Sequence, residues 1–99
     1  LDLKNINKAF ENKVRLGIMS ALMVNEELDF SSLKSLLELT DGNLASHTRS
    51  LEEMGYIQSK KQFVGRKPNT TYAITPEGRV AFTDHLNALE SFLRNSMRK

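Results

Sequence analysis

Residues 39–55 read LTDGNLASHTRSLEEMG and contain the start, the body and the end of one helix. Thr40 is a favourable N-cap, and the carboxylate of Asp41 is stabilised at the positive end of a helix. Gly55 follows as the glycine that allows a left-handed helix stop. The side chains with the spacing of a buried helix face are Leu44, Thr48, Leu51 and Met54. The segment therefore predicts a helix over residues 41–54.

The opposite face of this helix is polar, and between Gly42 and Ser50 it contains no acidic residue. The residues on this side are Gly42, Asn43, Ser46, His47, Arg49 and Ser50. Asn pairs bidentately with adenine, and Arg pairs with guanine or with a phosphate. A glycine lets the backbone approach a sugar-phosphate chain closely. These six residues are the candidate contacts to DNA, because the major groove, about 12 Å wide, admits one α-helix. His47 alone would also fit an ordinary histidine at a helix edge.

The sequence before this segment predicts a helix over residues 13–25, after at most a short helical turn in residues 1–12. Its apolar residues form two stripes, so two faces of this helix should be covered. The first stripe is Val14, Ile18 and Leu22, and the second is Leu16, Met19 and Met23. A very short strand is compatible with residues 28–30.

A second helix is predicted over residues 31–38, with Asp29 or Ser31 as its cap. Its expected buried face is Leu33, Leu36 and Leu37. A tight turn that contains glycine joins it to the helix over residues 41–54. Two helices joined in this way form a helix-turn-helix, whose second helix enters the major groove by its N-terminal half.

Two β-prone runs, residues 56–63 and 70–74, predict a hairpin whose connection is residues 64–69. Apolar and polar residues do not alternate cleanly along the first run. If Ile57 and Phe63 face the core, then Ser59 and Lys61 on the same face of the strand also face it. Either a β-bulge or an exposed outer half of the hairpin would account for this.

The hairpin is basic, although the net charge of the whole chain is only +2. Between Met54 and Pro76 there is no acidic residue, and the cations are Lys60, Lys61, Arg66 and Lys67. A segment with one sign of charge attracts a polyanion, so Lys60, Arg66 and Lys67 are candidate contacts to phosphates or to the minor groove. The alternative is that the lysines only protect an exposed strand edge.

The last helix is predicted over residues 76–96, because Thr75-Pro76-Glu77 combines a cap, a proline in the first turn and an acid near the positive helix end. Four of its apolar residues are spaced by 4, 3 and 4 positions, as in a coiled-coil seam: Phe82, Leu86, Leu89 and Leu93. We expect a homodimer through this helix, flanked by the first helix or the N-terminal arm. The expected contacts are Leu16, Met19, Phe82, Leu86, Leu89, Phe92 and Leu93. Alternatively, the last helix folds back fully and the chain is monomeric.

The composition excludes several classes of protein. The chain has 99 residues, enough for one domain over residues 1–99, and no cysteine, which excludes disulfides and thiolate metal sites. Its two histidines, including His85 beside Asp84, are too few for a metal centre, so we expect no metal and no cofactor. No nucleophile stands at motif spacing from a base, so no enzyme is expected. No apolar run reaches the ~20 residues of a membrane span, which favours a cytoplasmic protein without membrane contacts.

Residues 39–47 followed by residues 51–57 resemble the helix-turn-helix of MarR-like and ArsR-like repressors. The stretches Gly65-Arg66-Lys67-Pro68, Thr70-Thr71-Tyr72 and Thr75-Pro76-Glu77-Gly78 resemble a small winged-helix subfamily of those regulators. The resemblance covers about residues 13–93. It departs from the family pattern at Thr48, where Leu is usual, and at Ala45, where Ser is common.

This resemblance implies a winged helix-turn-helix fold that is mainly α, with a three-helical core, a small β-hairpin wing and a long C-terminal helix. It also implies a dimer that binds operator DNA through Asn43, Ser46, His47, Arg49, Ser50, Arg66 and Lys67. The expected function is a sequence-specific DNA-binding transcription regulator, a repressor, acting as a homodimer. The rival function is a protein-interaction module of a larger complex, which should show large apolar residues on the exposed face of the third helix.

Overall fold

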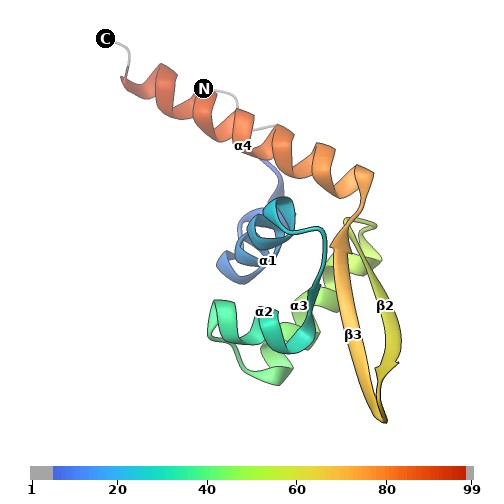
Figure 1. The fold of residues 1–99 in the computed structure, drawn as a ribbon. Helices are drawn as coiled ribbons and strands as arrows, with labels where there is room; N and C mark the ends of the chain where they lie inside the picture. Colours follow the sequence, from blue (N-terminus) through green and yellow to red (C-terminus); the bar gives the residue numbers. More distant parts are fainter. Residues whose placement is uncertain (1–5, 98–99) are drawn as a thin grey trace.

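The computed structural model describes residues 6–97 of the chain (Figure 1). Their elements are the 3-10 helix η1 (Lys8–Phe10), α1 (Lys13–Val24), β1 (Leu28–Asp29), α2 (Phe30–Leu37), α3 (Asp41–Glu53), β2 (Ile57–Val64), β3 (Lys67–Ile74) and α4 (Pro76–Met97). Three short helices form a bundle, a hairpin projects from it, and a long helix crosses its top. This is the predicted fold.

Local capping explains where the helices begin. Asn12 caps α1, Asp29 rather than Ser31 caps α2, and Thr40 caps α3; in each, a side-chain oxygen accepts a backbone N–H of the first turn. At the other end of α3, Gly55 has the left-handed backbone conformation that the sequence predicts, with φ of 81°. The predicted helix bounds are therefore correct to within one residue.

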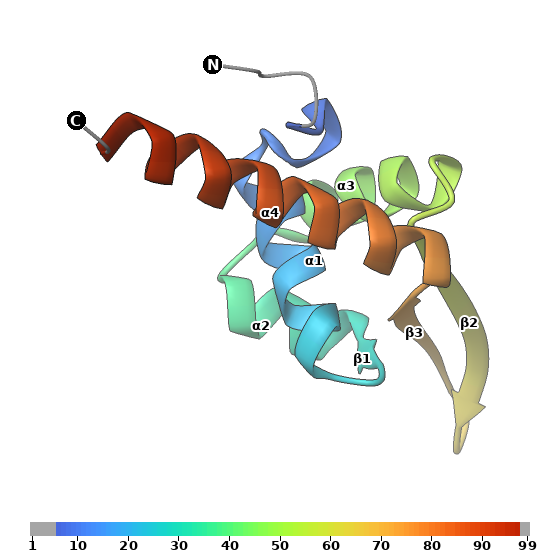
Figure 2. The ribbon, with the colours of Figure 1, turned by 90° about the horizontal axis from the view of Figure 1, so that it is seen from above.

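The hydrophobic core lies between three layers: α2 with α3, then α1, then α4 (Figures 1 and 2). Its buried hydrophobic residues are Ala9, Phe10, Ile18, Met19, Ala21, Leu22, Leu33, Leu44, Leu51, Ile57, Tyr72 and Phe82. Because α1 is covered on two sides, both of its apolar stripes pack within one chain.

Four sequence predictions about burial need correction. Met19 and Phe82 are 0% and 2% exposed, so they belong to this chain's own core and offer no surface to a second copy. The prediction that these two residues contact a second chain was wrong because the spacing of apolar residues along a helix identifies its apolar face but not what covers that face. Leu36 and Met54, predicted to be buried, are 59% and 41% exposed because they lie at the edge of the bundle.

The sheet has the strand order β1-β3-β2, and its hairpin is longer than predicted. The β2–β3 register runs unbroken from Ile57 opposite Ile74 to Val64 opposite Lys67, so the connection is two residues rather than six. Gly65, with φ of 68°, occupies the first of these two positions, where a type II′ turn requires positive φ. The inner end of β2 is buried and its outer half is exposed, so the irregular pattern reflects an exposed hairpin and not a bulge.

The junction between α3, β2 and α4 is held by one hydroxyl and one glycine. The Thr75 hydroxyl donates to the Gly55 carbonyl at 2.6 Å and accepts the Gly78 N–H at 2.9 Å. The backbone N–H of Thr75 donates to the Tyr56 carbonyl at 3.0 Å. A Cβ at Gly78 would lie 1.9 Å from that same carbonyl oxygen. The Thr-Pro-x-Gly sequence is therefore explained by the close packing of α4 on the end of α3.

We predict that Gly78→Ala destabilises the chain by about 1–3 kcal/mol or more, because the clashing atom is backbone and cannot rotate away. Urea unfolding followed by circular dichroism measures this difference. The matched control is Gly42→Ala, because a Cβ there would meet no other part of the fold within 4 Å. In a helix, alanine at that position should be neutral or stabilise by up to about 1 kcal/mol. Equal stability of the two variants would contradict the proposed contact.

Candidate nucleic-acid interface

The exposed face of α3 is polar in the structure, as the sequence predicts. Asn43, Ser46 and Arg49 are exposed together with Gly42, and Ser50 is half-buried. Large exposed hydrophobic side chains of the described residues lie elsewhere, on α4 and at the end of the hairpin among other places. The α3 face thus has the hydrogen-bonding groups that base edges require, and it lacks the apolar patch of a protein-docking helix.

The N-terminal end of α3 is less acidic than its sequence suggests. Asp41 forms an ion pair with Lys34 of α2, with 2.8 Å between Nζ and Oδ1. Both side chains are substantially exposed, so the pair contributes little stability. It does place a cation beside the only carboxylate of the first turn, which reduces the repulsion that a phosphate would meet there.

The buried face of α3 accommodates the unusual Thr48 without an unpaired polar group. Thr48 is 2% exposed, and its hydroxyl donates to the Leu44 carbonyl at 2.9 Å. This hydrogen bond within the helix satisfies the hydroxyl, while the methyl group packs in the core. Among the described residues, every buried side-chain nitrogen and oxygen has a hydrogen-bond partner.

His47 does not project freely from α3. The Arg15 Nε–H of α1 donates to His47 Nδ1 at 3.2 Å, and the imidazole is half-buried. Burial lowers the pKa of His47, and the positive charge of Arg15 lowers it further. With Nδ1 accepting, the neutral ring carries its proton on Nε2, where it can donate to a base or a phosphate. The arrangement also brings Arg15 to the α3 face.

Arg15 is a candidate contact that sequence reasoning missed. It lies in the first turn of α1, in a gap between the two apolar stripes. Its position in the sequence could have indicated this role, because an arginine between two apolar stripes must place its guanidinium outside the core, next to a neighbouring helix. That neighbour is α3, which packs against α1. Its guanidinium has further N–H donors besides the one given to His47.

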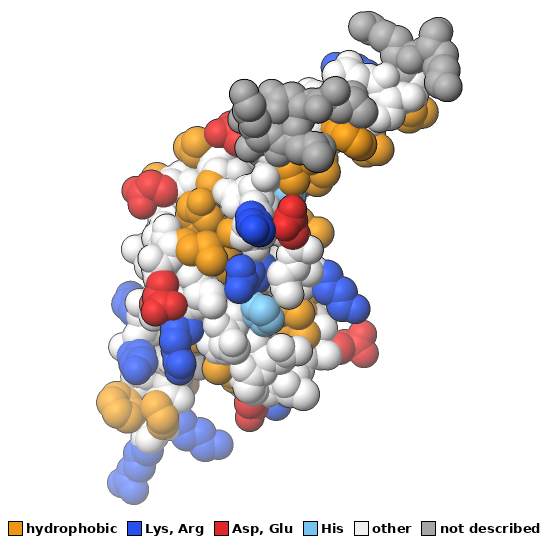
Figure 3. Space-filling view, turned by 180° about the vertical axis from the view of Figure 1, so that it is seen from behind, with side chains coloured by type: hydrophobic (Ala, Val, Ile, Leu, Met, Phe, Trp, Pro, Cys, Tyr) orange, Lys and Arg blue, Asp and Glu red, His pale blue; other side chains and the backbone are white. Residues whose placement is uncertain are grey.

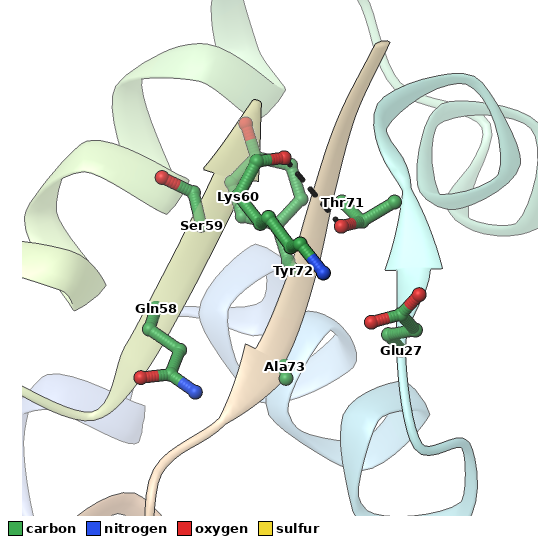
Figure 4. A pocket seen from close by; sticks show the side chains of 7 residues that line it. All are labelled: Glu27, Gln58, Ser59, Lys60, Thr71, Tyr72 and Ala73. Atoms are coloured by element: carbon green, nitrogen blue, oxygen red, sulfur yellow. Dashed lines mark hydrogen bonds between the residues drawn. The ribbon is translucent and has the colours of Figure 1, made fainter. Parts of the chain in front are cut away.

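The two central lysines of β2 lie on opposite faces of the hairpin, because side chains alternate along a strand. Lys61 shares a face with Ser59, whose hydroxyl donates to Glu52 of α3 at 2.9 Å. Lys60 lies on the other face, where its carbonyl accepts the Thr71 hydroxyl at 3.5 Å (Figure 4). The structure therefore brings Lys61, and not the expected Lys60, to the side of the hairpin on which α3 lies.

The outer face around Lys60 forms a shallow hollow with a volume of about 270 Å³. Its lining residues are Glu27, Gln58, Ser59, Lys60, Thr71, Tyr72 and Ala73. Figure 4 shows the Lys60 ammonium group reaching across β3 toward Glu27. The volume of this hollow is below the 300–1,000 Å³ of typical ligand pockets. Because Glu27 also lines it, Lys60 has an acidic neighbour on the face of the hairpin away from α3.

The free end of the hairpin carries the remaining predicted cations. Arg66 lies in the turn and Lys67 begins β3, and both are exposed. At this end, lower left in Figure 3, Lys and Arg side chains gather around hydrophobic ones. The hairpin and α3 thus form one surface, with polar side chains on the helix and positive charge on the projecting strands.

His85 of α4 is a structural residue of the core edge. It is 3% exposed, its ring packs against Phe10 and Phe82, and its Nδ1 accepts the backbone N–H of Asn7 at 3.0 Å. Burial lowers its pKa, with a weaker opposing effect from Glu11. Within residues 6–97 no cluster of three or more His, Asp or Glu side chains is suited to a metal ion. In the same range, no helix is both long and apolar enough to cross a membrane.

A helix-turn-helix followed by a β-hairpin, with a short strand that completes the sheet, is the element order of the winged helix class of domains. Residues 14–93 match the family model described as the winged helix DNA-binding domain, and the chain belongs to this family. An uncharacterized protein of Methanocaldococcus jannaschii is 38% identical over 88 residues, which are 89% of this chain and 96% of that protein.

Solved structures show the same fold. A transcriptional regulator homologue from Pyrococcus horikoshii OT3 has a TM-score of 0.87 and 35% identity, and the alignment covers 97% of each chain. PadR of Bacillus subtilis, solved in complex with operator DNA, has a TM-score of 0.68 and 15% identity, with 88% of this chain and 62% of that chain covered. At 15% identity this second likeness concerns the fold alone.

We predict that the free energy of unfolding decreases as the pH falls below about 6.5, the ordinary pKa of histidine. The pKa values of His47 and His85 are lowered in the folded chain, so the unfolded chain takes up protons first. The stabilisation is complete above the unfolded pKa and is lost as the pH falls through the folded values. Urea titrations between about pH 7.5 and 5 at constant ionic strength measure this loss.

The control for this prediction replaces both histidines by asparagine, whose side-chain oxygen can replace Nδ1 as acceptor. The chain contains two histidines, so the double variant has no side chain that ordinarily titrates near pH 6.5. Its stability should be nearly constant between about pH 7.5 and 6. An undiminished pH dependence in the double variant would show that other groups cause the effect.

Proposed function

We propose that this chain is a sequence-specific transcriptional regulator that binds duplex DNA as a homodimer and represses by occupying its site. The observation that carries the proposal is the exposed polar face of α3, lying beside a hairpin without acidic residues. In this proposal α3 lies in the major groove, and the hairpin lies over the adjacent phosphates and the minor groove. A dimer bound over a promoter excludes other proteins from it, which favours repression.

The N-terminal half of α3 supplies the proposed base contacts. Asn43 and Ser46 are exposed where a recognition helix meets base edges, and His47 offers its Nε2–H beside them. A methyl group in place of the Gly42 hydrogen would meet no other part of the fold within 4 Å, so the backbone there is open to a sugar-phosphate chain. Arg49 lies at the side of this face, where its guanidinium can reach a phosphate.

The proposed test is selection from random duplex DNA, followed by affinity measurements on the selected site at several salt concentrations. Asn43→Ala should cost about 1–3 kcal/mol and relax preference at one or two base positions. Lys61→Ala should weaken binding to all sequences equally and lower the salt slope by roughly 0.9 for one lost phosphate contact.

The matched control for the charge effect is Lys60→Ala, which removes the same charge from the opposite face of β2. It should change the salt slope less than Lys61→Ala does. Two observations would refute the DNA-binding proposal: no retention of the wild-type chain on duplex DNA, or an Asn43→Ala variant with unchanged affinity and preference.

The homodimer is proposed from α4, whose C-terminal half extends beyond the bundle (Figure 1). The helix has 22 residues, about 33 Å at 1.5 Å per residue, and it contributes with the hairpin to the elongated shape of 60 × 25 × 21 Å. Leu86 and Leu93 are 42% and 58% exposed, and Leu89 and Phe92 between them are half-buried. Such an apolar stripe on a projecting helix is typical of a subunit interface. Leu16 is half-buried against the core and offers little further surface.

A two-fold pair would present two α3 helices to a palindromic site, which doubles the contacts to DNA. We predict that the wild-type chain sediments at micromolar concentration with the mass of two chains. Leu86→Glu combined with Leu93→Glu should give the mass of one chain and weaken binding to a palindromic site, because two buried carboxylates would be unpaired.

The matched control is Ser91→Glu, which adds a carboxylate to the exposed side of the same helix away from the stripe. This variant should remain a dimer. A wild-type chain with the mass of one chain, or a double variant that retains the mass of two, would remove the dimer from the proposal.

A further inference from the structure

The end of the hairpin exposes two large apolar side chains that the core does not use. Phe63 is 74% exposed and Val64 is 63% exposed. β1 pairs with β3 at Thr71 and Tyr72, so the third strand supports the base of the hairpin and not this end. We call residues 63–68 the wing tip. Burial of such side chains is favourable, so their position at a projecting end points to an external partner.

The charge around the wing tip indicates what kind of partner it meets. Arg66 and Lys67 lie within it, Lys60 and Lys61 precede it, and no acidic residue occurs between Met54 and Pro76. Apolar groups ringed by cations suit a polyanion that also has apolar parts. The DNA minor groove has this character, with phosphates along its edges and sugars and base edges inside it.

The two apolar side chains face opposite ways. Phe63 alternates with Lys61 and Ser59, so all three lie on the face of β2 that contacts Glu52 of α3. Val64 lies on the other face, opposite Lys67 in the register. Phe63 pairs across the hairpin with Pro68, so the α3 side of the wing tip is an apolar edge made from both strands.

The hairpin carries Phe63 away from α3. Phe63 lies four residues beyond Ser59, whose hydroxyl contacts Glu52 at the C-terminal end of α3, and this corresponds to about 13 Å along a strand. The wing tip is thus displaced from the helix by about the width of one DNA groove. With the N-terminal half of α3 in the major groove, the proposal places this displaced tip over an adjacent minor groove.

We propose that Phe63 inserts as an apolar wedge into the minor groove and bends the DNA at that point. This inference rests on the proposed DNA-binding function and extends it to a specific contact. Phenylalanine is among the side chains that enter minor grooves between base steps, partly unstacking them and kinking the duplex by about 20–90°. In this proposal Lys61, Arg66 and Lys67 hold the wing tip against the phosphates, and Pro68 stiffens the strand opposite the wedge.

The experiment measures energy transfer between dyes at the two ends of a duplex that contains the selected site. The wild-type chain should increase transfer by bending the duplex. Phe63→Ser should abolish most of this increase and weaken binding by about tenfold, within the range for loss of one aromatic–base contact. Its salt slope should stay unchanged, because no phosphate contact is lost. Val80→Ser, which removes a similarly exposed apolar side chain from α4, outside the wing, is the matched control and should behave as the wild type.

The outcomes separate this inference from the function on which it rests. If Phe63→Ser bends and binds the site as the wild type does while Asn43→Ala loses binding, the wedge is wrong and the DNA-binding function stands. If the wild type does not bind duplex DNA, both are wrong. If Phe63→Ser instead changes the sedimenting mass, the wing tip is a contact between proteins and the wedge is overturned. Circular dichroism confirms that each variant is folded.

Discussion

The contact between Gly78 and the Tyr56 carbonyl determines how the functional elements are placed. A Cβ at Gly78 would lie 1.9 Å from that oxygen, so α4 approaches the end of α3 more closely than any other residue would permit. The Thr75 hydroxyl links the same two segments by hydrogen bonds to Gly55 and Gly78. Since α3 ends, β2 begins and α4 starts at this junction, the helix, the hairpin and the proposed dimer helix are joined with little freedom. The spacing of two recognition helices in a dimer would follow from this one close contact.

The two histidines extend this rigid arrangement to the N-terminal half of the chain. His85 holds the backbone of Asn7 against α4, and His47 holds Arg15 of α1 against α3. Each accepts a hydrogen bond through Nδ1, which requires a neutral ring, and burial lowers the pKa of each. The proposed DNA-facing surface is therefore not α3 alone, because Arg15 of α1 orients His47 of α3 and adds a guanidinium next to it. An acidic medium would weaken both links at once.

Sequence reasoning succeeded where local chemistry decides the structure and failed where packing decides it. The bounds of α3 followed from Thr40 and Gly55, since capping depends on neighbouring residues only. The length of the hairpin did not follow, because alternation appears only where one face is buried, and the outer half of β2 is exposed. In the same way, the roles of Lys60 and Lys61 could not be distinguished before it was known which face of β2 lies toward α3. Arg15 was missed because its role depends on which helix lies beside α1.

Two of the places where exposed apolar residues occur lie at far ends of the molecule, the C-terminal half of α4 and the wing tip. Neither is needed to close the core, so each is available to a partner, and we assign a second copy to one and DNA to the other. The close contact at Gly78 fixes the start of α4 against the inner end of β2, between these two surfaces. In a dimer, the separation of the two Phe63 side chains would then be set by α4 and not by the DNA. A duplex that receives both wedges must adopt the curvature that this separation imposes, so loss of the α4 interface should reduce bending as well as affinity.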